Sequence, residues 1–240
     1  MTRLDQLKVK IFADGADFDS IMALYANPLI KGFTTNPTLM RKAGVTDYAA
    51  FARKLAAAVP DRPLSLEVLA DDLPSMQAQA QVVASWGKNI NVKIPVTTTS
   101  GEFTGPIVAA LSAAGVVVNV TAVFTLEQVA AITQLLHPDT PAIVSVFAGR
   151  IADTGVDPVP LMTEAVRILA ARPKAELIWA SPRELLNVFQ ADEVGCHIIT
   201  VTTDLLAKLA LVGKPLEAFS RETVDMFYTD AIAAGYLINV

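Results

Sequence analysis

Short runs of β-branched and other apolar residues alternate along the whole chain with Ala- and Leu-rich stretches of helical spacing. Short apolar runs bounded by turn signals predict strands, and longer amphipathic stretches predict helices. The predicted strands cover residues 7–12, 30–34, 64–69, 90–94, 115–120, 142–147, 176–180 and 196–201. The predicted helices lie near residues 17–25, 47–59, 73–86, 105–114, 126–136, 158–171, 182–190 and 203–211.

This alternation predicts successive βα units and a parallel sheet. Eight such units in 240 residues favour an α/β fold of the closed (β/α)8 TIM-barrel type, as one domain spanning residues 1–240. The absence of a Gly-rich phosphate loop after the first predicted strand disfavours an open doubly wound sheet. A further helix is expected at residues 217–237. Residues 214–240 would then form a C-terminal helical extension that packs on its own barrel or on a neighbouring subunit.

The composition narrows the class of protein. Hydrophobic residues make up 52% of the chain and charged residues 18%, with a mean hydropathy of +0.44. A large core and surfaces buried against other subunits are therefore expected. The net charge of -5 gives no sign of nucleic-acid binding. One cysteine, Cys196, excludes an internal disulfide and fits a reducing compartment. Residues 1–8 lack a signal-peptide apolar region, and no apolar stretch is long enough for a bilayer, so a cytoplasmic protein without membrane partners is expected.

Polar side chains recur where the predicted strands end. In barrels of this kind the chemistry lies at the carboxyl ends of the strands, and the packed interior otherwise prefers apolar layers. Polar residues two positions apart on a strand share a face, so they would point into one mouth. The polar positions at or after strand ends are Asp14, Thr35, Asn36, Ser65, Glu67, Asn91, Lys93, Asn119, Thr121, Ser145, Arg150, Ser181 and Arg183. Their convergence predicts a functional site.

Lys93 is the most informative of these residues because it lies inside a run that otherwise indicates a buried strand, 89–96 (NINVKIPV). Burial without a partner favours the neutral form of an amine. A neutral amine can attack a ketone and form a Schiff base. The alternative for this segment is a lysine whose stem is buried and whose ammonium group reaches solvent from the strand end.

Two carboxylates accompany the lysine. Glu67 lies in the middle of a predicted strand, where an unpaired buried acid is unfavourable. It is therefore expected to pair with Lys93 on the next strand or to act as a base through water. Asp14 could cap the helix near Asp17, or it could move a proton to or from a substrate hydroxyl.

The arginines near the last strands predict an anion site. Arginine presents a planar fork of donors that suits phosphate, and Arg150 and Arg183 lie, with Ser181, where barrels often hold phosphate. Two solvated surface arginines are the alternative. No metal site is predicted, because His137 and His197 are isolated. Cys196 is expected to be a small buried hydrophobe rather than a nucleophile.

Five segments resemble motifs of the transaldolase family, in the family's order and over nearly the whole chain. They are 31–39 (KGFTTNPTL), 91–95 (NVKIP), 118–121 (VNVT), 145–150 (SVFAGR) and 180–183 (ASPR). The length resembles that of the short subfamily, which includes small transaldolases and fructose-6-phosphate aldolases.

The resemblance implies a class I mechanism without metal or organic cofactor, because a protonated imine is the electron sink. Lys93 would attack the C2 ketone of fructose 6-phosphate or sedoheptulose 7-phosphate, and Asp14 would take the C4 hydroxyl proton during C3–C4 cleavage. The other implied roles are water handling by Glu67 and Thr121, binding of the dihydroxyacetone unit by Asn36, Asn119 and Ser145, and phosphate binding by Arg150, Ser181 and Arg183. Thr35 and Phe147, from the same motifs, complete the expected substrate-binding set. Such an enzyme would serve the pentose phosphate pathway.

Two positions favour a transaldolase over an aldolase. The aldolase branch carries glutamine where this chain has Glu67, and tyrosine where it has Phe147. A tyrosine hydroxyl can help protonate the enamine, whereas phenylalanine cannot, so the enamine would wait for an aldehyde acceptor. Pro182 departs from the family, which more often has an aromatic residue there. A reshaped phosphate pocket and a related acidic sugar therefore stay open as alternatives.

A fructose-6-phosphate aldolase is the main alternative. A non-catalytic barrel that binds sugar phosphate is a remote one, since Lys93, Asp14 and Glu67 are all present. The resemblance to the short subfamily implies a ring-shaped decamer in which the last helix contacts a neighbouring subunit. The expected partners are thus sugar phosphates and further copies of the chain, with residues 217–237 as the contact.

Overall fold

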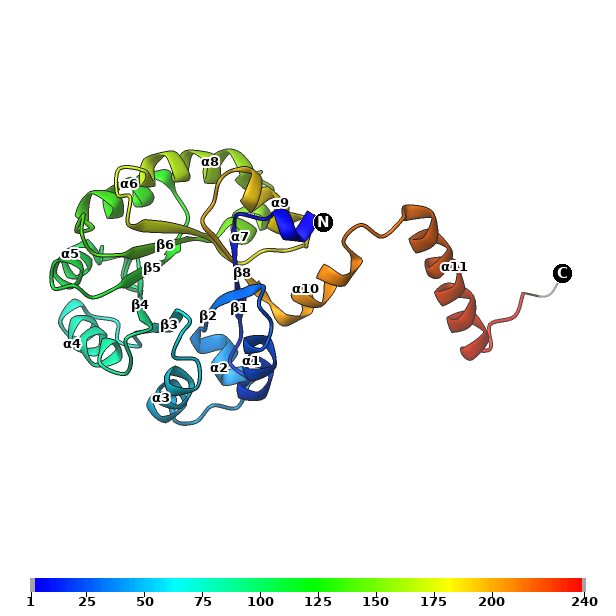
Figure 1. Ribbon diagram of the computed structural model, residues 1–240, viewed down its shortest axis with the longest axis horizontal. Helices are drawn as coiled ribbons and strands as arrows, with labels where there is room; N and C mark the ends of the chain where they lie inside the picture. The colour runs from blue at the N-terminus through cyan, green and yellow to red at the C-terminus, as the bar shows by residue number, and fades with distance from the viewer. Residues whose placement is uncertain (1–2, 239–240) are drawn as a thin grey trace. The chain divides into compact units, whose positions relative to one another are not determined.

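The computed structural model describes residues 3–238 of the chain. The chain falls into two compact units, one of residues 7–207 and one of residues 1–6 together with 208–240. The first unit is a closed barrel of eight strands, each hydrogen-bonded to the next and the last to the first (Figure 1). The predicted (β/α)8 fold class is confirmed.

The strands are all parallel to their neighbours and follow the predicted alternation. They are β1 (Lys10–Asp14), β2 (Ile30–Thr34), β3 (Leu64–Glu67), β4 (Ile90–Pro95), β5 (Val118–Val123), β6 (Ala142–Val146), β7 (Ala175–Trp179) and β8 (Ile198–Thr202). β1 begins later than the predicted residue 7. The backbone N–H groups of Lys8 and Val9 donate to the carboxylate of Asp192 instead of to a neighbouring strand.

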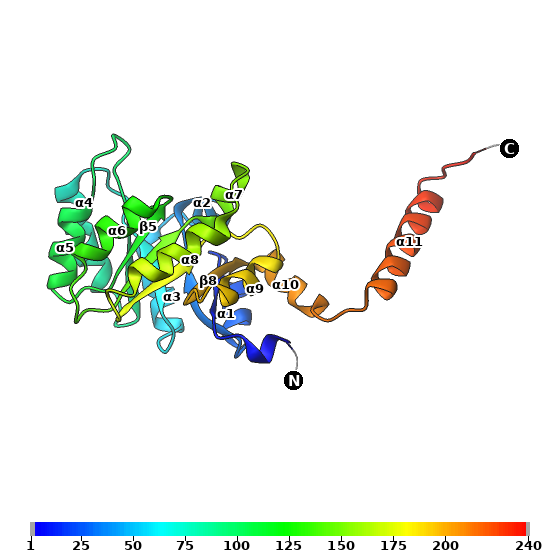
Figure 2. The ribbon, with the colours of Figure 1, turned by 90° about the horizontal axis from the view of Figure 1, so that it is seen from above.

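Helices surround the ring of strands, as α3, α4, α5, α6 and α8 show in Figures 1 and 2. The helices of the barrel unit are α1 (Phe18–Tyr25), α2 (Pro37–Lys42), α3 (Tyr48–Ala58), α4 (Leu73–Ala84), α5 (Gly105–Ala113), α6 (Leu126–Leu135), α7 (Ala148–Asp153), α8 (Pro158–Leu169), α9 (Leu186–Glu193) and α10 (Thr203–Ala207). Five of them begin at a side chain that accepts a backbone N–H three residues on, and these caps are Asp17, Asn36, Asp47, Asp72 and Thr125.

The helix pattern differs from the prediction at four places. The helices α2 and α7 are not predicted, because six residues each are too few for a helical period to appear. The helix α9 begins at Leu186 rather than at residue 182, since the chain turns at Ser181, where φ is 59°. The predicted 203–211 helix divides into α10 and a 3-10 helix, η2 (Lys208–Leu211).

The second unit contains η1 (Arg3–Gln6), η2 and α11 (Leu216–Ala233). The predicted final helix is present, but it ends at Ala233, shortly before Gly235 adopts a positive φ of 68°. None of the residues of α11 is buried. Its exposed large apolar side chains are Leu216, Phe219, Val224, Met226, Phe227, Tyr228 and Ile232. Within the described chain, no helix has the length and apolar character needed to cross a membrane.

Phe12 packs with Ile143, Ile178 and Ile198 into one buried apolar cluster, which we call the interior plug. Phe12 lies on β1 and is 1% exposed. Gly32 on β2 makes room for the ring, since a Cβ at that position would lie 2.5 Å from a Phe12 ring carbon. The space left by the missing side chain of Gly32 is thus filled by the Phe12 ring on the neighbouring strand.

Replacing Phe12 by Ala should lower the free energy of unfolding by about 3–5 kcal/mol, because the lost ring leaves a cavity between packed strands. Urea unfolding followed by circular dichroism measures the change. Phe12→Leu, which keeps much of the volume, is the matched comparison and should be less destabilised. A loss of less than about 1 kcal/mol for the alanine variant would contradict this role of the plug.

Candidate active site

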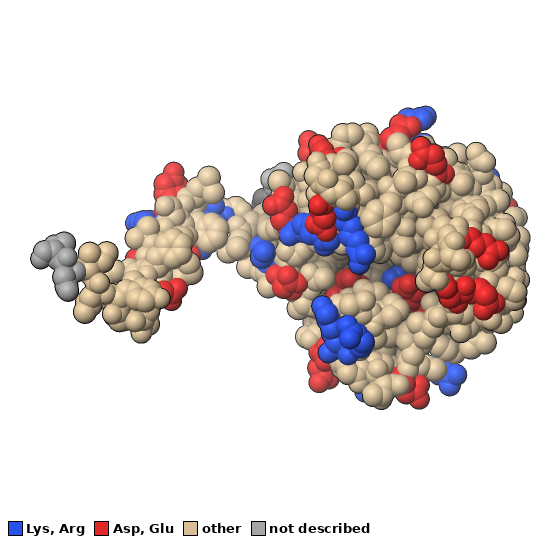
Figure 3. All heavy atoms as spheres, turned by 180° about the vertical axis from the view of Figure 1, so that it is seen from behind, with Lys and Arg blue, Asp and Glu red and all other residues tan. Residues whose placement is uncertain are grey.

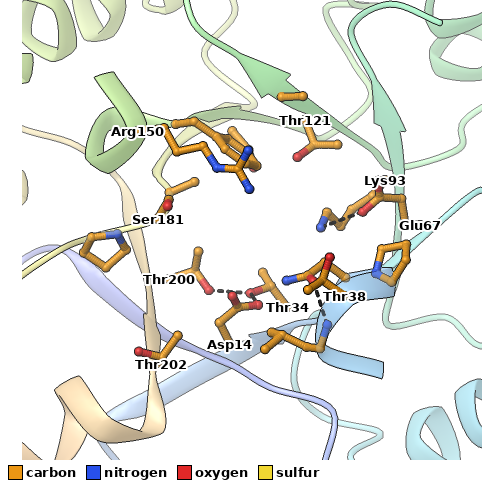
Figure 4. A pocket seen from close by; sticks show the side chains of 18 of the residues that line it. Asp14, Thr34, Thr38, Glu67, Lys93, Thr121, Arg150, Ser181, Thr200 and Thr202 are labelled. Atoms are coloured by element: carbon orange, nitrogen blue, oxygen red, sulfur yellow. Dashed lines mark hydrogen bonds and ion pairs between the residues drawn. The ribbon is translucent and has the colours of Figure 1, made fainter. Parts of the chain in front are cut away.

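A cavity of about 590 Å³ opens at the carboxyl ends of the strands (Figure 4). The predicted site residues that line it are Asp14, Asn36, Glu67, Lys93, Asn119, Thr121, Ser145, Phe147, Arg150, Ser181 and Arg183. In Figure 3, Lys and Arg side chains gather at two places beside a hollow in the barrel. The fold therefore brings together polar groups that are distant in sequence.

Lys93 is buried in this cavity and does not extend to bulk solvent. Its side chain is 8% exposed, and its Nζ donates to the backbone oxygen of Thr35 at 2.7 Å. Nζ also lies 3.0 Å from Oε2 of Glu67, whose side chain is 16% exposed. Glu67 and Lys93 are direct partners in the register of β3 and β4, which explains why the two charges meet inside the barrel. The ion pair expected from the sequence is present.

Asp14 faces the cavity from the end of β1 and does not cap a helix. The alternative that Asp14 caps the following helix is wrong, because Asp17 caps α1 by accepting the N–H of Ser20. The Oδ1 atom of Asp14 accepts a hydrogen bond from Thr34 Oγ1 at 2.8 Å. Burial raises the pKa of Asp14, although the Lys93 ammonium group and the Thr34 hydrogen bond act in the opposite direction.

Hydrogen bonds link β3, β5 and β6 across the barrel interior. The Asn119 amide donates through Nδ2 to Ser65 Oγ at 3.1 Å, and its Oδ1 accepts from Ser145 Oγ at 2.7 Å. Because Asn119 is fully buried, these two bonds fix which end of the amide points in each direction. Thr121 lies two residues further along β5 and also faces the cavity (Figure 4).

Asn36 and Thr35 are adjacent but have different surroundings. Asn36 lines the cavity, and its Oδ1 caps α2 by accepting the N–H of Leu39 at 2.9 Å. Thr35 is fully buried, and its hydroxyl donates to the backbone oxygen of Ser65. Thr35 does not belong to the cavity lining, so the geometry does not support the prediction that its side chain binds substrate. Its contribution is the backbone oxygen that holds Lys93.

Arg183 and Ser181 form one hydrogen-bonded group at the cavity. The Arg183 guanidinium donates through Nε and Nη2 to the two carboxylate oxygens of Asp153, at 2.8 and 2.5 Å. Through Nη1 it donates to Ser181 Oγ at 2.9 Å. Arg150 instead stacks on Phe147, with Cζ 5.4 Å from the ring centroid. Both arginines are therefore oriented by neighbours.

The backbone at two cavity residues is held in a conformation that side chains other than glycine rarely adopt. In the described chain, Ala122 and Ser181 are the non-glycine residues with positive φ, at 57° and 59°, and both line the cavity. Gly149 accommodates the turn at Ser181, because a Cβ there would lie 1.5 Å from the Ser181 backbone oxygen. Only glycine fits at position 149.

Several residues of the lining are not predicted from the sequence. They are Thr34, Thr38, Leu39, Lys42, Ala122, Ala180, Thr200 and Thr202. Thr200 and Thr202 alternate along β8 in the same way as Asn119 and Thr121 along β5, so periodicity could have revealed them. Lys42 lies on α2, and no strand period points to it.

The two histidines and the cysteine do not belong to the cavity lining. Among the described residues, no group of three or more His, Cys, Asp or Glu side chains is placed to hold a metal ion. The Nδ1 atom of His197 accepts the N–H of Leu177. Burial raises the pKa of the Cys196 thiol to about 12, so Cys196 is a buried small side chain, as its context predicts.

A buried amine bonded to a carboxylate, with arginines at the same mouth, is suited to carbonyl chemistry on anionic molecules. Fold and site together thus define a (β/α)8-barrel enzyme of the aldolase type. The sequence pattern of the transaldolase/fructose-6-phosphate aldolase family matches residues 11–236, and the chain belongs to that family.

Relatives of known name are similar over most of their length. The probable transaldolase of Thermoanaerobacter sp. (strain X514) is 34% identical over 231 residues, which cover 96% of this chain and 100% of that protein. The probable transaldolase of Dehalococcoides mccartyi is 34% identical over 202 residues, covering 84% and 90%. Probable transaldolase 2 of Listeria monocytogenes is 32% identical over 219 residues, covering 89% and 95%. The resemblance of the sequence motifs to those of the transaldolase family is confirmed.

Proposed function

We propose that this protein is a transaldolase that transfers a dihydroxyacetone unit through a Schiff base on Lys93. The donor would be fructose 6-phosphate or sedoheptulose 7-phosphate, and the acceptor an aldose phosphate. The observation that carries the proposal is the Lys93–Glu67 ion pair inside a cavity that Asp14 also lines. Family membership, and relatives named as probable transaldolases, support it.

Imine formation would begin with a proton transfer. The Lys93 ammonium group must lose a proton before it can attack the C2 ketone, and Oε2 of Glu67, 3.0 Å away, can take that proton. The new N–C2 bond gives a carbinolamine, and Glu67 would then return the proton to the departing hydroxyl group. Loss of water leaves a protonated imine. Thr121, which faces the same cavity, would orient this water.

Asp14 would act in the cleavage step. It would take the C4 hydroxyl proton, the C4–O bond would become a carbonyl, and the C3–C4 bond would break. The electron pair of that bond would move into the imine and give an enamine, so the reaction needs no separate cofactor. Burial raises the pKa of Asp14, which strengthens it as a base. An aldehyde acceptor would reverse these steps.

The remaining polar groups would orient the substrate. The hydrogen bond from Ser145 to Asn119 holds both side chains in place before substrate binds. Their amide and hydroxyl groups would bind the hydroxyl groups of the three-carbon unit. Asn36 would contact the same unit from the start of α2. The proposed phosphate ligands are Arg150, Ser181 and Arg183, and the carboxylate of Asp153 would keep the Arg183 fork in place.

Phe147 favours transfer over simple aldol cleavage. Its ring packs against Phe124, with centroids 5.7 Å apart, and Arg150 stacks on it. A phenyl ring has no proton to give, so the enamine would wait for an aldehyde rather than be released as dihydroxyacetone. As part of the same proposal, the enzyme would work in the pentose phosphate pathway in the cytoplasm.

The proposal includes assembly of several copies of the chain. The apolar side chains of α11 are exposed, among them Phe219 at 44%, Phe227 at 63% and Tyr228 at 70%. Such a row of large apolar groups is unfavourable in water and is typical of a surface that contacts another subunit. A homo-oligomer, with the 214–240 extension as a contact, fits the low share of charged residues.

Replacing Lys93 by Met should abolish trapping of a substrate imine by borohydride. Transfer activity should fall by on the order of a thousandfold or more, because the nucleophile is lost. Mass spectrometry after incubation with fructose 6-phosphate and borohydride detects the adduct. Lys88→Met is the matched control, since Lys88 is exposed just before β4, and it should still be trapped. Trapping that persists without Lys93 would contradict the mechanism.

Release of glyceraldehyde 3-phosphate from fructose 6-phosphate should require erythrose 4-phosphate. The reason is that Phe147 cannot protonate the enamine, so turnover needs an acceptor. A coupled assay with and without the acceptor measures both rates in one preparation. Equal release without the acceptor would mean an aldolase and would contradict the interpretation of Glu67 and Phe147. No release in either case would point to a different donor sugar.

Removal of residues 214–240 should reduce the particle mass measured by light scattering. Phe219→Glu with Phe227→Glu should have the same effect, since it places charge on the apolar side chains of α11 without shortening the chain. Arg221→Glu, a charge change at an exposed polar position of the same helix, is the control and should retain the mass. An unchanged mass for both α11 variants would count against the subunit contact.

A further inference from the structure

Asp14, Thr34 and Thr200 lie on adjacent strands and form one line of hydrogen bonds beside the cavity (Figure 4). Thr34 Oγ1 donates to Asp14 Oδ1 at 2.8 Å. The hydroxyls of Thr34 and Thr200 share a second hydrogen bond. Both threonines are buried, yet both line the cavity, so this line of bonds lies at the boundary between core and site.

The direction of the bonds follows from the chemistry of the groups. An ionised carboxylate only accepts, so Thr34 directs its one hydroxyl proton to Asp14. The Thr200 hydroxyl must therefore donate to Thr34. Each bond in such a line polarises the next, so both hydroxyls stabilise the charged form of Asp14. Threonine is stiff about χ1, and packed strands fix the backbone, so the two oxygens are held in place.

The same bonds decide which carboxylate oxygen of Asp14 is available to a substrate. Oδ1 is bonded to Thr34, whereas Oδ2 has no hydrogen-bond partner in the part of the chain that the structure describes. Asp14 lines the cavity from the end of β1. We propose that Thr34 and Thr200 are positioning residues, which hold Asp14 ionised with Oδ2 directed to the substrate. The inference rests on the proposed role of Asp14 as the base of the cleavage step.

Other charges around Asp14 do not change when a threonine hydroxyl is removed. The Lys93 ammonium group favours ionised Asp14, and the Glu67 carboxylate opposes it. Further charged groups line the same cavity, namely Lys42 on α2, Arg150 and Arg183, and Asp17 and Asp204 border an adjoining cavity that Asp14 also lines. A shift in the pKa of Asp14 on loss of a threonine hydroxyl would therefore report the contribution of the lost hydrogen bond.

The experiment compares Thr34→Val and Thr200→Val, which remove a hydroxyl and keep the shape. The pKa of Asp14 is measured by carbon-13 NMR of protein with labelled aspartate, and Asp14→Asn assigns its resonance. In Thr34→Val the pKa of Asp14 should rise by about one unit, the size expected for a lost hydrogen bond to a carboxylate. Thr200→Val should give a smaller rise, and Thr34→Ser should restore the original value.

The rate of transfer should follow the titration. Asp14 acts as a base in its ionised form, so a higher pKa moves the acid limb of kcat to higher pH by the same amount. KM should change little, because the hydroxyls act through Asp14. Thr133→Val is the matched control, since it removes a buried hydroxyl that donates within α6, to Val129. Neither the Asp14 titration nor the acid limb should move in that variant.

Each outcome bears on the inference. An unchanged Asp14 pKa in both Thr34→Val and Thr200→Val would overturn it, and if Thr34→Val does not fold, Thr200→Val alone decides. A raised pKa with an unmoved acid limb would overturn the positioning role together with the role of Asp14 as base. A wild-type chain without transfer activity would overturn only the proposed function, because the NMR titration still tests how the threonines hold Asp14.

Discussion

Closure of the eight-stranded barrel is the constraint on which the rest of the structure depends. Side chains alternate along each strand, so closure turns every second residue toward the inside, where it must be packed, paired or left facing a cavity. The strand β1 shows two of these outcomes. Phe12 belongs to the interior plug, and Asp14, two residues further on, faces the cavity. The same face of one strand therefore supplies both a packed interior residue and a cavity residue.

The Lys93–Glu67 pair is a consequence of this closure. On an open sheet edge either charge could turn toward water, but here the two residues are held opposite each other by the register of β3 and β4. Transfer of two charges into a protein interior costs several kcal/mol for each ion, and their attraction offsets this only with good geometry and further hydrogen bonds. The backbone oxygen of Thr35 supplies one such bond. An apolar pair would often be at least as stable, so the charges point to chemistry rather than to stability.

Much of the site could be predicted because it lies on regular strands. A period of two places Glu67, Lys93 and Asn119 on the inner face once their strands are recognised, and the structure has them there. The same period explains why Thr35 is not part of the lining. Thr34 and Asn36 face the cavity, so Thr35 between them points to the other side, where its hydroxyl donates to the backbone oxygen of Ser65. The short helices α2 and α7 escape prediction for a different reason, since neither contains two full periods.

Contacts between distant segments that lie outside the strands could not be predicted. Asp153 and Arg183 are 30 residues apart and meet only because β6 and β7 are neighbours in the closed ring. The requirement for glycine at position 149 arises from the backbone of Ser181, which no local pattern around Gly149 contains. Both features concern the side of the site that would hold an anion. Family motifs include the residues, but the reason for each residue type is visible only in three dimensions.

The barrel contains a second lysine–glutamate pair, and the contrast between the two shows the effect of burial on such a pair. Lys10 and Glu176, near the amino ends of β1 and β7, are 2.5 Å apart, with side chains 40% and 35% exposed. Water screens such a pair, which contributes about 0–1 kcal/mol and can open at little cost. Lys93 and Glu67 are the same residue types at 8% and 16% exposure, held opposite each other inside the closed barrel. Burial, rather than residue type, therefore distinguishes the two pairs: water screens the exposed pair, whereas the barrel encloses the pair that lines the cavity.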